Sequence, residues 1–277
     1  FQYHPGQYVE VLLRDGDRRS YSMASAPRTQ GTPVMELHIR HMPGGKFTDH
    51  VFGALQPKEI WRIEGPFGSF YLREDSDKPI VVVGAMRPAT AYSADGPANL
   101  LDACSVAASP GARGRGTLVV MNGRIHSGLW VGKRHVSSVE AFDSPLAGAV
   151  GEVADQAVQW FRSAGRQPTV AWKTPAAWPR VDIAVAYAGV DETALRAFVA
   201  AGAQGIVHAG LGNANTPTAY RGFIQSLPAQ GVLVARCARF ITGSVTRASV
   251  YADAQHGILT AGPLPPHKVR IVMLLGL

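Results

Sequence analysis

Apolar and polar positions follow one pattern up to about residue 77 and another pattern after it. In the first part, residues 9–13 have the character of a strand, and residues 35–40 and 60–64 alternate apolar and polar side chains with a period of two. Gly and Pro punctuate these segments, and a Gly-Pro-Phe-Gly break is expected at residues 65–68. Only residues 46–55 are expected to be helical. This pattern predicts a small antiparallel β-barrel segment.

From residue 78 onward, apolar runs of strand length alternate with helical periods. The expected strands are residues 80–83, 117–121, 181–187, 205–208 and 231–235. The expected helices are residues 98–108, 191–201 and 220–230. Such alternation predicts an α/β fold with a mostly parallel sheet covered on both faces. The apolar run at residues 271–275 also has the length of a strand.

A linker is expected at residues 167–180, which hold three prolines and two tryptophans. We therefore expect four parts along the chain. They are a barrel segment at 1–77, an α/β unit at 78–166, the linker at 167–180 and a second α/β unit at 181–277.

Composition and charge narrow the range of functions. Of 277 residues, 46% are hydrophobic and 17% are charged, which suits folded cores and argues against a disordered chain. No apolar run reaches the roughly 18 residues of a membrane-spanning helix, so no membrane partner is expected. The net charge of +7 comes from residues 78–277, where 18 Lys and Arg against 10 Asp and Glu give +8, while residues 1–77 contribute −1. These cations are scattered and form no stripe interleaved with aromatic residues, which argues against nucleic acid as a partner.

The cysteines, the histidines and the start of the sequence add further expectations. Two cysteines, Cys104 and Cys237, are too few for a disulfide framework, and each is expected as a lone thiol in a core. The nine histidines show no ligand spacing, so no metal site is expected. The sequence begins at Phe1 without a secretory signal pattern. A cytoplasmic location is expected, with a removed leader as the alternative.

Candidate chemistry in the first 77 residues gathers at one strand end and one turn. In an extended chain Arg19 and Tyr21 point to the same side, beside the hydroxyl group of Ser22. An aromatic ring and a fork of donors suit a planar cofactor with a phosphate tail. Paired glycines before a helix, as at residues 44–48, let backbone N–H groups approach a phosphate. Each signal alone is also common in ordinary surface strands and turns.

Four stretches in this order resemble a known family. They are PGQYV at 5–9, RSYSMAS at 19–25, GGKFT at 44–48 and GPFGSF at 65–70. The segment resembles the flavin-binding barrel of the ferredoxin–NADP reductase superfamily, especially oxygenase reductase components. The resemblance implies FAD as cofactor, with the flavin and its diphosphate at Arg19, Tyr21 and Ser22. It further implies that the phosphate is held by Gly45, Lys46 and Thr48.

This resemblance has two gaps. The first strand of the family's barrel has no counterpart in these residues. The Gly-Gly-Thr-Gly turn of the family's nicotinamide domain is replaced by Gly-Ala-Met-Arg-Pro at residues 84–88.

Candidate chemistry after residue 78 is sparse. Lys133 follows an expected strand, where a lysine can assist a nucleophile, although an isolated loop lysine is usually solvated. The sequence GLGNAN at 210–215 also follows a strand, where open α/β sheets bind ligands. An ordinary strand–helix turn explains this sequence equally well.

Longer stretches carry a second resemblance, to the bacterial L-asparaginase family of the type II kind. They are SDKPIVVVGAMRPAT at 76–90, SADGPANL at 93–100, RGTLVVMN at 115–122, VAYAG at 185–189, AGLGNAN at 209–215 and PHKVR at 266–270. The resemblance implies two parallel-sheet units and hydrolysis of asparagine, often also glutamine, by a threonine hydroxyl group without a cofactor. A lysine maps onto Lys133. An asparagine that completes the site of a neighbouring subunit maps onto Asn215, which implies a homo-oligomer.

The match lacks the parts of the family that carry its chemistry. The nucleophilic threonine belongs to a stretch that the flavin-type segment replaces. The family's Asp-Val-Thr-Lys reads Trp-Val-Gly-Lys at residues 130–133, and the glutamate of its C-terminal domain maps onto Ser249.

Three functions remain open from the sequence. The first is an asparaginase-family amidohydrolase that is inactive or impaired. The second is an FAD-binding reductase component without its nicotinamide domain. The third is a non-catalytic chimera or assembly module. The sequence does not distinguish a natural fusion from a designed or computed one.

Overall fold

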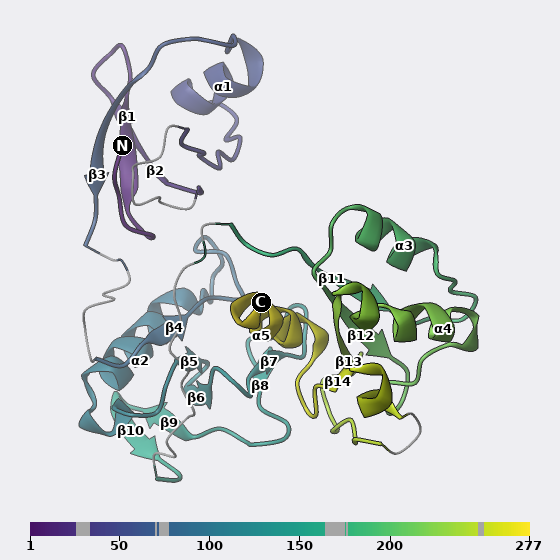
Figure 1. The fold of residues 1–277 in the computed structure, drawn as a ribbon. Coiled ribbons are helices and arrows are strands. Elements are labelled where there is room, and N and C mark those ends of the chain that lie inside the picture. Colours follow the sequence, from purple (N-terminus) through teal and green to yellow (C-terminus); the bar gives the residue numbers. More distant parts are fainter. Residues whose placement is uncertain (26–33, 70, 72–77, 164–174, 176, 249–251) are drawn as a thin grey trace. The chain divides into compact units, whose positions relative to one another are not determined.

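The computed structural model describes residues 1–25, 34–69, 71, 78–163, 175, 177–248 and 252–277. The chain divides into two compact units, Phe1–Asp77 and Lys78–Leu277, both drawn in Figure 1. Most of the expected linker lies outside the described residues. None of the described helices has both the length and the apolar character needed to cross a bilayer.

The first unit is built on a three-stranded antiparallel sheet with the order β2-β1-β3. Its middle strand buries Val9 and Val11, which are 0% and 1% exposed. One helix packs beside the sheet through Phe47. The elements are β1 (Tyr8–Leu12), β2 (Arg18–Ser22), α1 (Lys46–Gly53) and β3 (Arg62–Phe67).

Two expectations for this unit are corrected. Residues 35–40 form no strand, because their pairing in the described part of the chain is limited to one bridge between Met23 and Leu37. The break expected at 65–68 lies inside β3, because Phe67 pairs with Tyr8 across an irregularity in the ladder. Pro66 is tolerated there because β3 is an edge strand. The described residues form an open sheet instead of a closed barrel.

The second unit begins with a five-stranded sheet in the order β10-β9-β6-β5-β4. One face packs against α2, with Ala103 and Val106 of the helix against Leu118 and Val120 of β5. The elements are β4 (Val81–Val83), α2 (Gly96–Ala108), η1 (Pro110–Ala112), β5 (Leu118–Met121), β6 (Arg124–Ser127), β9 (Gly151–Ala154) and β10 (Ala157–Trp160).

The prediction of a mostly parallel sheet is wrong for this sheet. Only β4 and β5 run parallel, while β5, β6, β9 and β10 pair in antiparallel fashion. Tight turns reverse the chain at Asn122–Gly123 and Asp155–Gln156, where all four residues have positive φ angles. Such turns join two-residue hairpins, and Asn-Gly is a strong sequence signal for them. A separate short ribbon pairs β7 (Gly132–Lys133) with β8 (Phe142–Asp143).

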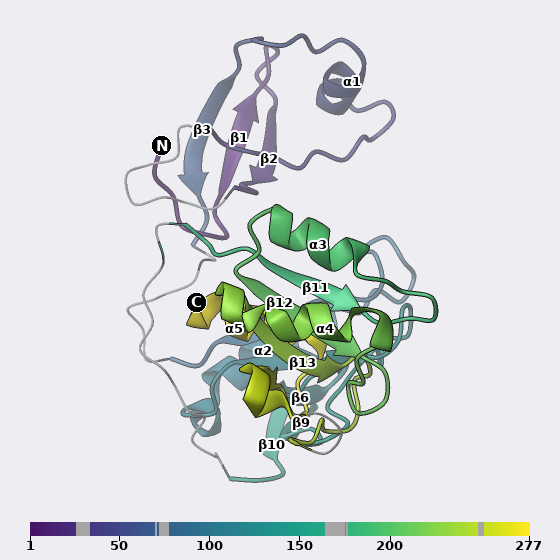
Figure 2. The ribbon, with the colours of Figure 1, turned by 45° about the vertical axis from the view of Figure 1, so that its right-hand side comes forward.

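The second sheet of this unit is parallel, as predicted, in the order β11-β12-β13-β14. Figure 2 shows α3 and α4 on one face and α5 on the other. The elements are β11 (Val181–Val185), α3 (Thr193–Ala200), β12 (Gly205–Gly210), α4 (Thr218–Ser226), η2 (Pro228–Gln230), β13 (Leu233–Ala238), η3 (Asp253–His256), β14 (Leu259–Thr260) and α5 (Pro266–Gly276).

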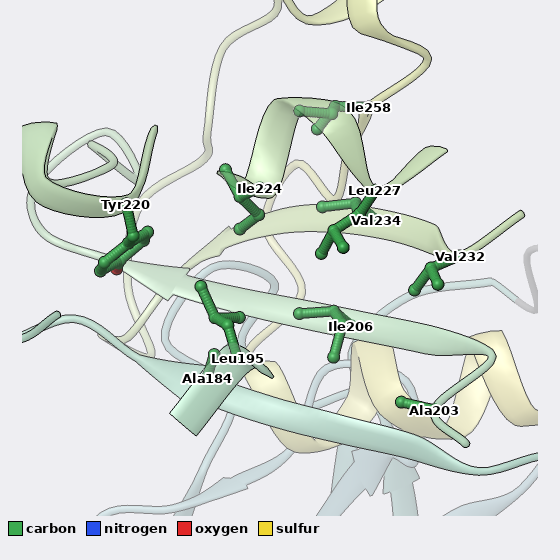
Figure 3. Close-up of a cluster of buried hydrophobic side chains, with 10 residues drawn as sticks. All are labelled: Ala184, Leu195, Ala203, Ile206, Tyr220, Ile224, Leu227, Val232, Val234 and Ile258. Carbon is green, nitrogen blue, oxygen red and sulfur yellow. The ribbon is translucent and has the colours of Figure 1, made fainter. Parts of the chain in front are cut away.

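Alternate residues of the strands enter two separate cores. Ile206 and Val234 face Leu195 of α3 and Ile224 of α4, as Figure 3 shows. Their chain neighbours, among them Val207, face α5 instead. Because both faces are covered, β12 is buried along its whole length.

Two further expectations are corrected in this unit. The run 271–275 is part of helix α5, because Pro266 starts the helix and Val269 and Met273, four positions apart, pack on the sheet. Cys237 is a buried free thiol as expected, but Cys104 is exposed on α2.

Candidate functional sites

β2 presents the aromatic side chain predicted to contact a flavin. Arg19 and Tyr21 share the half-buried face of this strand, while Ser22 is exposed on the other face. The ring of Tyr21 lies 5.4 Å from that of Phe47, which meets Trp61 edge-on at 4.7 Å, both between centroids. Burial raises the pKa of Tyr21. Tyr21 therefore belongs to an aromatic cluster that fixes its orientation.

The cations predicted to hold a phosphate are already paired with carboxylates. Lys46 Nζ lies 2.7 Å from Asp15 Oδ2 and 3.1 Å from Asp17 Oδ2. Arg19 Nη2 lies 3.3 Å from the same Asp17 oxygen. The hydrogen bond from Lys46 lowers the pKa of Asp15. All four side chains are exposed, so each pair is worth at most about 1 kcal/mol, and a phosphate could displace the carboxylates.

Gly45, in the turn before α1, is required by the local packing of that turn. The Thr48 hydroxyl donates to the Met42 carbonyl oxygen at 2.9 Å and accepts from the Met42 N–H at 3.2 Å. A Cβ atom on Gly45 would lie 2.6 Å from Thr48 Oγ1, so the turn needs glycine there. Thr48 is buried, and its hydroxyl group is bonded to the Met42 backbone. The predicted phosphate contact by Thr48 has no support in this geometry.

A groove of about 680 Å³ runs beside this cluster. It is lined by six residues, Val11, Lys46, Phe47, His50, Trp61 and Arg62, and by the segments 12–15 and 59–60. Aromatic and apolar walls with cations at one side fit a planar ring that carries a phosphate tail. The lining residues Phe47, Trp61 and Lys46 therefore fit a flavin, whereas Tyr21 and Arg19 do not line the groove.

In the second unit, polar groups meet where β4 and β5 end. Asn99 Nδ2 donates to the Gly84 carbonyl oxygen at 2.9 Å, and Asn99 Oδ1 accepts from the Asn122 N–H at 2.9 Å. Asp95 accepts from the N–H groups of Met86 and residue 87, which lowers the pKa of its carboxyl group. These bonds fix the loop at the carboxyl ends of the parallel strands, where α/β sheets bind ligands.

Lys133 lies in the short ribbon β7–β8. Its side chain is exposed, and its ammonium group lies 5.9 Å from the centre of the Phe142 ring. The segment before it is held by a second lysine. Lys268 of α5 donates to the carbonyl oxygens of Gly128, Leu129 and Val131 at 2.9, 2.7 and 2.5 Å. Lys268, which the sequence analysis did not single out as functional, therefore positions the loop that leads to Lys133.

Asn215 ends the loop that follows β12. Its N–H donates to the Leu211 carbonyl oxygen at 2.7 Å, and its side chain is exposed. Arg236, only 2% exposed, donates through Nη1 to the Ala214 carbonyl oxygen at 2.7 Å. Asp253 binds the rest of this guanidinium group in bidentate fashion, at 2.7 and 2.5 Å. A buried ion pair thus holds the loop that presents Asn215.

The structure places the two predicted catalytic residues in different elements, Lys133 in strand β7 and Asn215 in the loop after β12. Within the described residues, no hydrogen bond or ion pair joins Lys133 to Asn215. Ser249, the predicted counterpart of the family's glutamate, lies outside these residues. No group of three or more His, Cys, Asp or Glu side chains suited to a metal occurs in the described part. The sequence carries a sign of the buried ion pair of Arg236, because a charged residue inside the apolar strand LVARCA needs a buried partner.

Comparisons with known proteins assign the two compact units largely to different protein families. Residues 1–71 match the oxidoreductase FAD-binding domain. Residues 67–166 match the N-terminal domain of asparaginase, and residues 180–277 match the C-terminal domain of glutaminase and asparaginase.

Individual relatives agree with the second assignment. The glutaminase-asparaginase of Pseudomonas fluorescens is 41% identical over 211 residues, covering 74% of this chain and 58% of the relative. The probable periplasmic L-asparaginase of Haemophilus influenzae is 38% identical, covering 73% and 59%. The crystal structure of a probable cytoplasmic L-asparaginase from Campylobacter jejuni matches with a TM-score of 0.69 at 33% identity, covering 73% of this chain and 65% of that one.

The two sheets, with helices on both faces of the second, define a two-part α/β unit. Residues 67–166 and 180–277 are thus similar to the two domains of the asparaginase family, and residues 1–71 are similar to an oxidoreductase FAD-binding domain. The chain spans about three fifths of the length of the curated relatives that it matches.

Proposed function

We propose that residues 78–277 form an asparaginase-type scaffold in which hydrolysis of L-asparagine to L-aspartate and ammonia is lost or strongly impaired. The surroundings of Lys133 support this proposal. The three residues before it, Trp130, Val131 and Gly132, carry no hydroxyl group, and the only recorded side-chain contact of Lys133 in the described residues is with Phe142. A lysine that assists an attacking hydroxyl group needs that group within hydrogen-bond reach.

Ammonia release from L-asparagine and L-glutamine by the purified chain tests this proposal. We expect the chain and a Lys133→Met variant to release ammonia at the same background rate. Lys58→Met, in the first unit, controls for the loss of one exposed positive charge. Turnover above background that Lys133→Met abolishes and Lys58→Met leaves intact would overturn the proposal.

Two further proposals, on self-association and on cellular location, rest on the similarity to the asparaginase family. We propose that the chain self-associates, because Asn215 is exposed on its loop and is available to a neighbouring copy. Light scattering that finds only monomers would contradict this. We propose a cytoplasmic location, supported by the name of the Campylobacter relative, and a periplasmic fraction of the full protein would contradict it.

A second function, binding of FAD by residues 1–71, is favoured by the aromatic cluster beside the groove. In this proposal the flavin ring packs against Tyr21. The diphosphate replaces Asp15 and Asp17 as the ion-pair partner of Lys46 and Arg19. Bound flavin would supply redox chemistry.

Flavin titrations monitored by absorbance and fluorescence test the second function. We expect FAD to bind more tightly than riboflavin, which has no phosphate. Lys46→Met should remove this preference, and Lys58→Met should keep it. Removing the competing carboxylate with Asp17→Asn should strengthen FAD binding. A colourless protein that does not bind added FAD would contradict the proposal.

A further inference from the structure

Strand β4 has the composition of an interior strand. Residues 80–83 are Ile-Val-Val-Val, with no polar position on either face. Such continuous apolar runs are typical of strands in parallel sheets that are buried on both faces. Edge strands usually carry a charge, a proline or a bulge that prevents further pairing. Residues 80–83 have no charge or proline.

The structure nevertheless places β4 at the edge of its sheet. It pairs in parallel with β5 on one side, and no strand among the described residues pairs with its other side. Val81 and Val83 pack on the core beneath α2. Ile80 and Val82, on the opposite face, are 46% and 48% exposed.

Helix α2 covers the other face of β4, the face of Val81 and Val83. It packs against β4 and β5 with its inner face, and its outward residues Leu100 and Leu101 are each 49% exposed. The unpaired backbone of β4, Ile80, Val82 and these two leucines are called the β4 edge below. A β-strand that adds to the sheet satisfies the backbone, and the helix that accompanies a parallel strand covers apolar side chains.

Two observations indicate what covers the β4 edge. The chain covers only 65% of the Campylobacter structure and 58% of the Pseudomonas relative, so a large part of the asparaginase fold has no counterpart here. Residues 78–277 carry 18 Lys and Arg against 10 Asp and Glu, so at the β4 edge a partner without excess positive charge is favoured.

We propose that the β4 edge docks a parallel β-strand, with its helix, from a second polypeptide that carries the part of the asparaginase fold absent from these 277 residues. Val82 is central to this surface because its side chain is 48% exposed. The backbone groups at the free edge are those of its neighbours Val81 and Val83, since the Ile80 carbonyl oxygen accepts from the Leu118 N–H of β5 and backbone direction alternates along a strand. The proposal does not require catalysis.

A binding experiment with a matched control tests the proposal. The probe is a labelled fragment of the Pseudomonas fluorescens glutaminase-asparaginase, comprising the N-terminal stretch that this chain does not match. Binding to the full chain is measured by fluorescence anisotropy. Val82→Lys should weaken binding at least about tenfold, as a desolvated charge costs more than 1.4 kcal/mol. Val185→Lys is the control, since Val185 lies on the edge strand β11 of the other sheet and is also 48% exposed.

A second measurement keeps the test decisive if Val82→Lys does not fold. Hydrogen exchange of the unmodified chain should slow at β4 when the fragment is added and stay unchanged at β11. Absence of binding, equal weakening by both substitutions, or protection at β11 would overturn the proposal. Self-association without the fragment that Val82→Lys blocks would also overturn it, because the occupant would then be a second copy. Ammonia is not the readout, so this test is independent of the proposed loss of amidase activity.

Discussion

Arg236 shows at the scale of one residue why an apolar strand contains a charge. Its guanidinium group is 2% exposed, pairs with Asp253 and donates to the backbone of the Asn215 loop. Burial of an unpaired charge is costly, so the arginine and the aspartate depend on each other. The sequence reveals the arginine but not its partner, because 17 positions separate the two residues.

Replacement of Asp253 by asparagine should lower the free energy of unfolding by about 3 kcal/mol, because it leaves the Arg236 charge buried without a counterion. Urea unfolding of the purified variant measures this loss. Asp182→Asn removes a carboxylate from an exposed pair with Arg180 and should cost less than about 1 kcal/mol. Equal losses in the two variants would show that the buried pair does not contribute as described.

His208 makes the second unit sensitive to acid. It is fully buried, its Nε2 lies 2.9 Å from the Tyr220 hydroxyl, and its Nδ1 has no hydrogen-bond partner within the described residues. Burial, with a smaller effect of the Arg236 charge, lowers the pKa of His208 from 6.5 to about 4. The unfolded chain therefore binds a proton between these values that the folded chain does not bind.

Protonation of His208 in the unfolded chain should lower the free energy of unfolding by about 3 kcal/mol as the pH drops from 6.5 to 4. Well below pH 4, His208 should contribute no further change. Urea unfolding at a series of pH values measures the slope. A His208→Gln variant should be less stable at neutral pH but lose less stability on acidification. The same pH slope in both proteins would contradict the role given to His208.

At the scale of elements, continuous apolar runs and helical periods predict well and short antiparallel strands do not. β12 and α2 to α4 agree with the sequence predictions because each has a strong pattern of its own. Strands β6, β9 and β10, of four residues each, are too short for such a pattern. Helix α5 was not among the predicted helices, and its apolar run has only the length of a strand, because Ile271 and Val272 are apolar although about half exposed.

The candidate sites were predictable to a similar degree. The shared face of Arg19 and Tyr21 follows from the period of a strand and is confirmed. The roles given to Lys133 and Asn215 rest on resemblance and stay predictions. The hold of Lys268 on the loop before Lys133 spans about 140 positions, so no local pattern reveals it.

The last residue of β12, Gly210, leads into the following turn and must be glycine. A Cβ atom on Gly210 would lie 2.4 Å from the backbone of Ala214, which has a positive φ angle of 56°. Gly210→Ala should therefore lower the unfolding temperature. Gly222→Ala, inside α4 with nothing within 4 Å, should stabilise the protein by about 0.5–1 kcal/mol. A thermal melt of each variant measures both effects, and opposite signs are expected.

The whole molecule joins two units of different families at residue 77. The three hydrophobic core clusters of the second unit are formed by its own residues alone, and the net positive charge also lies in this unit. The 277 residues combine a segment similar to an FAD-binding domain with a unit similar to the two asparaginase domains. In that unit, β4 lies at a sheet edge among the described residues.

The central claim is that residues 78–277 fold as an asparaginase-type unit without residues 1–77. Calorimetry of the full chain and of residues 78–277 alone tests it most directly. The account predicts that the unfolding transition of the larger unit appears in both samples at the same temperature. Loss of this transition from residues 78–277, or a large shift of its temperature, would contradict the account.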